Sequence, residues 1–265
     1  MLGLGNSLTG GTALSNFTNY SVSFNGSDDF MIITEADALK PTAAISISLW
    51  AKPNAWDMTG GGDTDVILGC LSSGGFRIYL NNTGGNATTL NFQIRVDDTG
   101  SGSAGYITAT VNEATTEAFS GWKNITATYD GTTAKLYVNG GTSGVTNATS
   151  ASGAAIAYHG SSHRPIMIGA DAGGNDTTGE NFYHGLVDDV AVWNDDLSAA
   201  EVTAVYNNGV PFDLTANKGD YASKGDLVGY WIFEEGSGTS IADSSTNSNT
   251  GGAGNAWSWS TDIPE

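Results

Sequence analysis

Cysteine is almost missing from this chain. Cys70 is the single cysteine among 265 residues, so no disulfide can form within the chain and its stability must come from packing. Its neighbours Ile67, Leu68 and Leu71 are apolar, a setting typical of a small hydrophobic side chain in a strand. We therefore expect Cys70 to be a buried thiol.

Positive charge is also scarce. The sequence has 9 Lys and Arg against 28 Asp and Glu, which gives a formal net charge of −19 at pH 7. Such a chain repels phosphate backbones and anionic lipid surfaces, so we expect no nucleic-acid partner. No apolar run approaches the length that spans a bilayer, so we expect no insertion into a membrane. The acids suit a salty medium, or loops that collect carboxylates around Ca²⁺, and the two interpretations are compatible.

The residues that are abundant in the sequence are those typical of strands joined by tight turns. Apolar residues make up 39% of the chain, enough to fill a core between two sheets, and 37 Gly accompany many Ser, Thr and Asn. The length suits a single β-sandwich. We predict an all-β fold in which helix is confined to one short segment near 198–207.

A regularly alternating strand is predicted over residues 186–193. Leu186, Asp188, Val190 and Val192 fall on one face, and the residues between them fall on the other. If the valine face is the core, an uncompensated Asp188 carboxylate there would cost several kcal/mol. Asp188 is therefore either a hydrogen-bonded structural acid or a ligand of a cation.

A short capped helix follows this strand. Ser198 is placed to cap it, Glu201 to complete a capping box, and Asn208-Gly209 to end it in a left-handed conformation. This order of strand, turn and helix resembles the end of the laminin-G-like jelly rolls, a branch of the concanavalin-A-like lectin and glucanase fold. The resemblance implies a two-sheet antiparallel jelly-roll sandwich, and it carries a fold rather than a function.

Three further stretches extend the resemblance over most of the chain. Residues 20–30 look like the family's early hairpin, and residues 45–53 are similar to its following strand. Residues 121–140 predict another hairpin, whose turn at Asp130-Gly131 has the residue types of a type I′ turn. Asn139-Gly140 begins the next turn.

The end of the chain departs from the family's order. Residues 226–251 resemble the family's opening segment, yet they follow the closing helix. Either the chain is circularly permuted and this strand returns to the sandwich, or a second module begins and stops after one strand. A lone apolar strand would be prone to aggregate, so we favour permutation. The expected organisation is an N-terminal arm over 1–19, the jelly roll over 20–209, a connector over 210–226 and a completing segment over 227–265.

The sequence offers little for catalysis. Glucanases of this fold carry a Glu-x-Asp-x-Glu spacing that projects paired acids about one sugar apart, and that pattern does not occur here. Glu234 and Glu235 are adjacent and would project to opposite faces. The three histidines lack the spacing of a metal site, and there is no Gly-x-Ser-x-Gly turn. We therefore expect no enzymatic activity.

Two Gly-rich loops hold the acids that suit calcium. Oxygen ligands at alternate positions, separated by glycines, fit an ion that takes many oxygens in irregular geometry. Neither loop matches an EF-hand, and solvated turns are the alternative interpretation. The candidate ligands are Asp57, Asp63 and Asp65 in the first loop, Asp171, Asn175 and Asp176 in the second, and Asp188 in the strand.

The aromatic residues divide into an expected core and candidate sugar contacts. Those in alternating strands are expected in the core: Trp50, Trp122, Trp193 and Trp231. Trp56 and Tyr158 stand in polar or Gly-rich surroundings, where an exposed ring can stack on a pyranose, and they are the candidates for glycan binding. Trp257 and Trp259 either do the same or pin the C-terminal strand to its neighbour.

Two compatible function classes fit these observations. The first is a non-catalytic module that binds cell-surface glycans, such as a secreted bacterial adhesion module; this is the family's commonest use. The second is a phage virion component, a decoration or fibre protein that contacts virion proteins or copies of itself. The first residues show neither the basic region nor the apolar core of a classical secretion signal. We predict a phage-type surface protein, on the virion or extracellular, with glycan binding.

Overall fold

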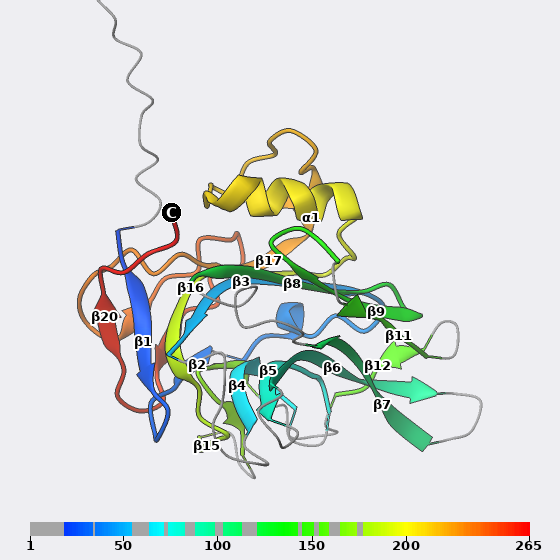
Figure 1. The fold of residues 1–265 in the computed structure, drawn as a ribbon, viewed down its shortest axis with the longest axis horizontal. Helices are drawn as coiled ribbons and strands as arrows, with labels where there is room; N and C mark the ends of the chain where they lie inside the picture. The colour runs from blue at the N-terminus through cyan, green and yellow to red at the C-terminus, as the bar shows by residue number, and fades with distance from the viewer. Residues whose placement is uncertain are drawn as a thin grey trace, which may run out of the picture.

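A sandwich of two antiparallel sheets, with a short helix outside the first sheet, forms the protein (Figure 1). The computed structural model describes residues 19–33, 35–54, 64–71, 74–82, 88–98, 103–112, 121–142, 145–150, 154–158, 165–173 and 177–265. Within these ranges the all-β jelly-roll sandwich predicted from the sequence is confirmed. The one α-helix described has 8 residues, too few to cross a membrane.

The first sheet has β16 (His184–Trp193) near its centre, paired with β3 (Ile45–Pro53) on one edge. Its other edge has two partners in succession, β1 (Ser21–Asn25) and then β17 (Leu227–Trp231). The remaining strands extend the sheet to both sides: β8 (Lys123–Tyr129), β9 (Thr133–Val138) and β11 (Ala148–Thr149) beyond β3, and β20 (Ser258–Ser260) beyond β1.

The second sheet lies below the first in Figure 1. Its strands follow in the order β10 (Val145–Thr146), β7 (Ser103–Asn112), β6 (Thr88–Asp98), β5 (Phe76–Asn82), β4 (Thr64–Gly69), β13 (Met167–Ile168), β2 (Met31–Ile33), β19 (Gly251–Ala253) and β18 (Ser240–Ile241), and β12 (Ala155–Ile156) also pairs with β6. A small two-stranded sheet joins β14 (Asp171–Ala172) to β15 (Gly179–Glu180).

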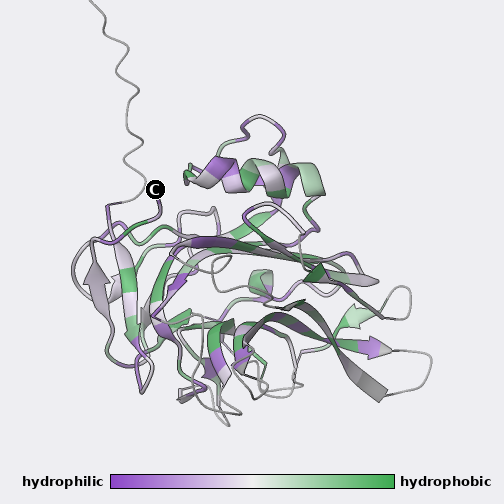
Figure 2. Cartoon of the chain, in the orientation of Figure 1, coloured by the Kyte–Doolittle hydropathy of each residue, from purple (hydrophilic) through white to green (hydrophobic). Residues whose placement is uncertain are grey.

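The main core fills the space between the two sheets. Alternation along the strands sends about every second side chain inward. Hydrophobic residues accordingly recur along the strands of both sheets (Figure 2). Cys70, just after β4, is buried there as predicted, and burial raises the pKa of its thiol to about 12. The largest buried side chains of this core are Trp231, Tyr129, Tyr183, Phe24, Phe76, Phe92 and Phe233.

A second core lies between the outer face of the first sheet and helix α1 (Ala199–Tyr206). The predicted capping box is confirmed, because Ser198 Oγ accepts from the Glu201 N–H and Glu201 Oε2 accepts from the Ser198 N–H. The helix ends at Tyr206, since Asn207 already has a left-handed φ of 46°. The predicted left-handed residues Asn208 and Gly209 follow, with φ of 56° and 97°. Its buried face packs on Trp193, whose indole N–H donates to the Tyr221 hydroxyl at 3.1 Å.

Two local predictions were wrong. Residues 20–30 do not form a hairpin, because β1 belongs to the first sheet and β2 to the second. The intervening loop crosses the sandwich and is held by Asn25 Oδ1, which accepts from the N–H groups of Ser27 and Asp28. The 121–140 hairpin is present as β8 and β9, but its turn is not type I′, since only Gly131 of the predicted pair has a positive φ.

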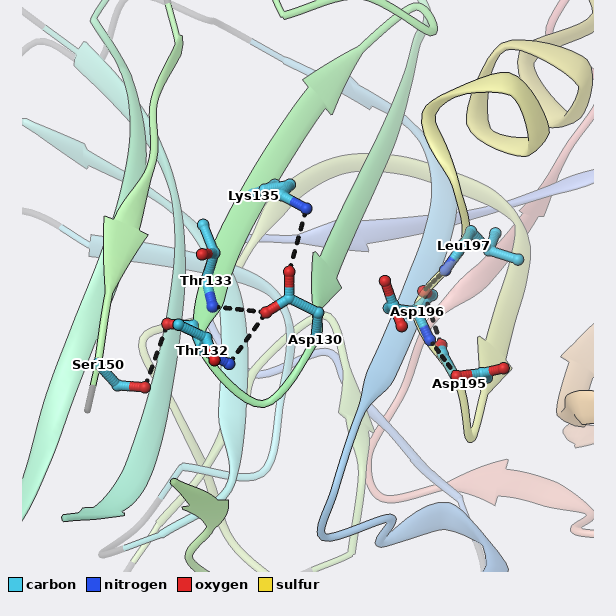
Figure 3. A network of polar contacts seen from close by, with 9 residues as sticks. Asp130, Thr132, Thr133, Lys135, Ser150, Asp195, Asp196 and Leu197 are labelled. Atoms are coloured by element: carbon cyan, nitrogen blue, oxygen red, sulfur yellow. Dashed lines mark hydrogen bonds and ion pairs between the residues drawn. The ribbon is translucent and has the colours of Figure 1, made fainter. Parts of the chain in front are cut away.

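The turn after β8 is built by a side chain instead. The Asp130 carboxylate accepts from the N–H groups of Thr132 and Thr133, and it pairs with Lys135 Nζ at 3.2 Å (Figure 3). These bonds outweigh the effect of partial burial and lower the pKa of Asp130. A local carboxylate thus replaces the backbone conformation that the Asp-Gly pair suggested.

The C-terminal segment contributes strands to both sheets. β17 pairs with β16 and β20 pairs with β1 in the first sheet, while β19 pairs with β2 in the second. Trp231 and Phe233 are fully buried in the main core. The apolar side chains after residue 226 are therefore part of the sandwich, whereas the domain limits proposed from the sequence stay a prediction.

Candidate functional site

The outer face of the first sheet has two parts, one covered by helix α1 and one hollowed and open. Helix α1 covers the part where β3 begins and β16 ends, around Trp193. Tyr206, at the end of the helix, contacts Trp50 further along β3, with ring centroids 6.1 Å apart. At the opposite end of these strands the surface is hollowed. Lys52 of β3 faces outward there because Ile45, Ile47, Leu49 and Ala51 alternate inward.

Two adjoining hollows form what we call the groove. One has a volume of about 280 Å³ and the other about 400 Å³, and both are lined by Lys52 and Asp262. Strand register explains how distant residues meet, since Lys52 pairs with Leu186 and Leu186 with Ser23 across three neighbouring strands. The polar and aromatic lining comprises Ser23, Phe24, Lys52, Asn54, Trp122, His184, Thr261, Asp262 and Glu265.

Asp262 ties the two hollows together. Its carboxylate accepts from Lys52 Nζ at 2.5 Å and from the Trp122 indole N–H at 2.9 Å. The tail that carries it is fixed by Ser21 Oγ, which donates to the Asp262 carbonyl at 2.7 Å. Partial burial alone would raise the pKa of Asp262, but the Lys52 and Trp122 hydrogen bonds outweigh it and the pKa is lowered.

Trp122 corrects a prediction from the sequence. It was expected in the core, but it precedes β8 and is only partly buried, with its indole N–H on Asp262. The other three tryptophans expected in the core, Trp50, Trp193 and Trp231, are buried. Trp122 thus brings an aromatic ring to a hollow that also has charged side chains, an arrangement suited to a ligand with both apolar and polar surface.

The predicted glycan contacts lie elsewhere or outside the described residues. Trp56 is outside them. Tyr158 is partly buried at the edge of the main core, where its ring meets Phe76 edge-on and its hydroxyl donates to the Pro41 carbonyl at 3.0 Å. Trp259 lies in β20 against Val22 of β1, which fits the alternative role of pinning the C-terminal strand.

Within its described ranges, the structure does not bring the predicted calcium ligands together. Asp57, Asp63, Asn175 and Asp176 are outside the described ranges, and Asp65 lies in β4. Within the described ranges, no three acidic, histidine or cysteine side chains are close enough to hold a metal. Calcium binding therefore stays a prediction.

Asp171, one of these candidates, already has partners. Its Oδ1 accepts from the N–H groups of Leu71 and Ala172, and its Oδ2 pairs with Arg77 at 3.3 Å. Burial raises the pKa of Asp171 even so. This carboxylate fastens β14 to the second sheet, which is a structural role.

Asp188 lies at a β-bulge, which the regular alternation expected from the sequence did not predict. A β-bulge interrupts β16 between Asp188 and Ala191, so that Val187 joins Val190 and Val192 in the main core and Asp188 turns to the outer face, opposite Trp50. Asp189 has a left-handed φ of 46°. The bulge coincides with the point where the edge partner of β16 changes from β1 to β17.

Both aspartates of the bulge are buried and incompletely hydrogen-bonded. Asp188 Oδ1 accepts from the Asp189 N–H at 2.9 Å, and Asp189 Oδ1 accepts from the Tyr230 hydroxyl at 2.8 Å. Each carboxylate has a second oxygen without a hydrogen-bond partner in the described part of the chain. Burial raises the pKa of Asp189 to about 8, and burial together with the charge of Asp189 raises the pKa of Asp188 well above its ordinary value. The pair favours bound protons or a cation.

A two-sheet antiparallel jelly roll with one short helix on its outer face defines the class of concanavalin-A-like sandwiches. Residues 25–203 match the Laminin_G_3 family, described as the concanavalin A-like lectin/glucanases superfamily, and the chain belongs to this family. No protein with a curated description is similar enough in sequence to count as a match.

Solved structures share the fold at low sequence identity. A candidate carbohydrate-binding protein from Bacteroides ovatus ATCC 8483 superposes with a TM-score of 0.60 and 17% identity over 93% of this chain, which spans 61% of that protein. A heptameric SAP-like pentraxin from Limulus polyphemus gives a TM-score of 0.48 and 16% identity, covering 72% of this chain and 82% of that one. Domains LG4-5 of the mouse laminin α1 chain give 0.43 and 18%, covering 66% and 41%.

Proposed function

We propose that this protein is a non-catalytic surface protein that binds glycans in the groove on the outer face of its first sheet. The main observation behind the proposal is that Trp122, Lys52 and Asp262 lie together in one hollowed surface. An indole ring provides a face for the C–H side of a sugar, while ammonium, carboxylate and amide groups exchange hydrogen bonds with its hydroxyls. The family membership and the Bacteroides ovatus structure support a lectin-like role.

The chemistry of Asp262 supports the non-catalytic part of the proposal. A glycosidase needs a carboxylic acid that keeps its proton near neutral pH, beside a second carboxylate at a defined separation. Asp262 instead has a lowered pKa, because Lys52 and Trp122 stabilise its ionised form. A carboxylate held in this way is suited to accept hydrogen bonds from hydroxyl groups.

Binding to a glycan array, measured for the wild-type protein and for Trp122→Ala, tests the groove. The wild-type protein should bind at least one glycan, and Trp122→Ala should lose about five- to thirtyfold in affinity, since stacking on an aromatic ring contributes on the order of 1–2 kcal/mol. Tyr106→Ala is the matched control, because Tyr106 is 49% exposed and lies on the second sheet. Equal losses in both variants would remove the groove from the proposal, and no binding by the wild-type protein would refute it.

The location we propose is the surface of a phage particle, with an extracellular bacterial adhesion module as the alternative. The acidic charge of −19 and the absence of internal disulfides fit both. Quantitative mass spectrometry of purified phage particles distinguishes them. A fixed number of copies per particle supports the first location, and its absence from particles together with recovery in culture medium supports the second.

A further inference from the structure

The charges that line the groove point to the kind of glycan it accepts. Lys52 is the one ammonium among the described residues that line the two hollows, and Asp262 and Glu265 are carboxylates of the same surface. The Lys52 ammonium lies 2.5 Å from the Asp262 carboxylate, so its charge is already compensated. Two carboxylates thus accompany one ammonium in the lining of the groove, within a protein of net charge −19.

A sugar that carries a carboxylate or sulfate meets two obstacles there. It must displace Asp262 from Lys52, and it must then lie beside the displaced carboxylate. Displacement is opposed by the chain itself, because the Asp262 carbonyl accepts from Ser21 Oγ and its N–H donates to Ser260 Oγ at 3.1 Å. A tethered carboxylate competes at a far higher effective concentration than a free ligand does.

A neutral sugar meets neither obstacle. Its hydroxyls can donate to the outer lone pairs of Asp262 and Glu265 while the Lys52–Asp262 pair stays closed. Resting on the glycan binding proposed above, we propose that the groove is selective for neutral glycans and that Asp262 is the residue that sets this selectivity by occupying Lys52.

Asp262→Asn tests this inference with little change in shape. The amide oxygen still accepts from the Trp122 indole N–H, but the negative charge is gone and the Lys52 ammonium is free for an anionic ligand. Asp97→Asn is the matched control, since Asp97 is an exposed residue of β6 in the second sheet and the change in net charge is the same. Thermal unfolding of each variant confirms that the fold is retained.

The probes are oligosaccharide pairs with the same backbone, such as cello-oligosaccharides and their C6-oxidised glucuronate forms, and galactan and galacturonan oligomers. We expect the wild-type protein to bind neutral members and not their uronate counterparts. Asp262→Asn should gain about tenfold or more in affinity for a uronate member, with a gain that fades as salt is added. Adding Lys52→Met to this variant should abolish the gain, and Asp97→Asn should show none.

Three outcomes would overturn the inference: wild-type preference for uronates, no uronate gain in Asp262→Asn, or an equal gain in Asp97→Asn. Each of these leaves glycan binding in the groove intact. Failure of the wild-type protein to bind any neutral or acidic member overturns the proposed function itself, so the two failures are distinguishable.

Discussion

Replacing Asp189 by Asn should remove a steep pH dependence from the stability of this protein. The folded-state pKa of Asp189 is raised to about 8 from an ordinary 3.8, because its carboxyl is buried. Between these two values the folded protein holds a proton that the unfolded chain has released. The free energy of unfolding therefore falls as pH rises, by about 1.4 kcal/mol per pH unit for this group alone. This stabilisation is complete below the unfolded pKa and is lost as pH rises through the folded pKa.

The asparagine amide is neutral at every pH, and its oxygen can still accept from the Tyr230 hydroxyl. Relative to the wild-type protein, the variant should therefore gain up to about 4 kcal/mol between roughly pH 5 and pH 8. In a plot of unfolding free energy against pH, the slope for the variant should be smaller by about 1.4 kcal/mol per pH unit, the contribution of one proton. The buried position makes this gain large, since solvent screening is weak there.

Urea unfolding, followed by tryptophan fluorescence in EDTA at several pH values, measures the effect. EDTA keeps divalent ions away from the Asp188–Asp189 pair, so that protonation alone is observed. The unfolding free energy of Asp97→Asn should change with pH in parallel with that of the wild-type protein, because Asp97 is exposed. Parallel curves for the wild-type protein and Asp189→Asn would refute the reasoning and show that the pair is ionised, and compensated, in the folded state.

Three further predictions concern the segments around this pair. Truncation after Asn217 should abolish cooperative thermal unfolding, because it removes β17 and the fully buried Trp231; an unchanged midpoint would contradict the topology. Ser198→Ala should cost about 1 kcal/mol in urea unfolding through loss of the capping box, and a cost near zero would mean that the helix is held by packing alone. Millimolar Ca²⁺ should raise the melting midpoint by several degrees more than Mg²⁺ at equal ionic strength, and Asp188→Asn should cancel this difference. Asp171→Ala should leave it, since that carboxylate is already bonded to backbone N–H groups; equal effects of the two ions would exclude a specific site.

The strands and the helix could be predicted from the sequence because local patterns determine them. The inward alternation of Ile45, Ile47 and Leu49 follows from the period of a strand, and the capping box of Ser198 and Glu201 lies within a single turn. Each of these features is decided by residues a few positions apart. Tertiary context did not override them.

The bulge in β16 could not be predicted in the same way. Alternation was extended through Asp188 and Asp189 as if the strand were regular, whereas the strand gains a residue where β1 gives way to β17. That exchange depends on a strand about 40 residues further along the chain. The one local hint was the pair of acids itself, since adjacent aspartates are unusual in a buried strand.

The groove was missed for a related reason. Lys52, Trp122 and Asp262 are far apart in the sequence, and Lys52 and Asp262 are separated by 210 positions. No spacing rule connects them, and Trp122 was expected in the core because the sequence placed it within an alternating strand, whereas β8 begins only at Lys123. Only the register of β3, β16 and β1, together with the path of the C-terminal tail, brings them to one surface.

β1 and β17 share one edge of β16, and this arrangement affects how the chain folds during synthesis. β1 leaves the ribosome before its partners β16 and β20, which begin at His184 and Ser258, so both of its edges stay unpaired until those later segments are made. β16 itself gains its second edge partner only when β17 has been made. Pairing between such distant segments is slow and leaves apolar strands exposed in the interval. We therefore expect productive folding to begin in the local β5–β6–β7 meander and to finish only after β20 has been made.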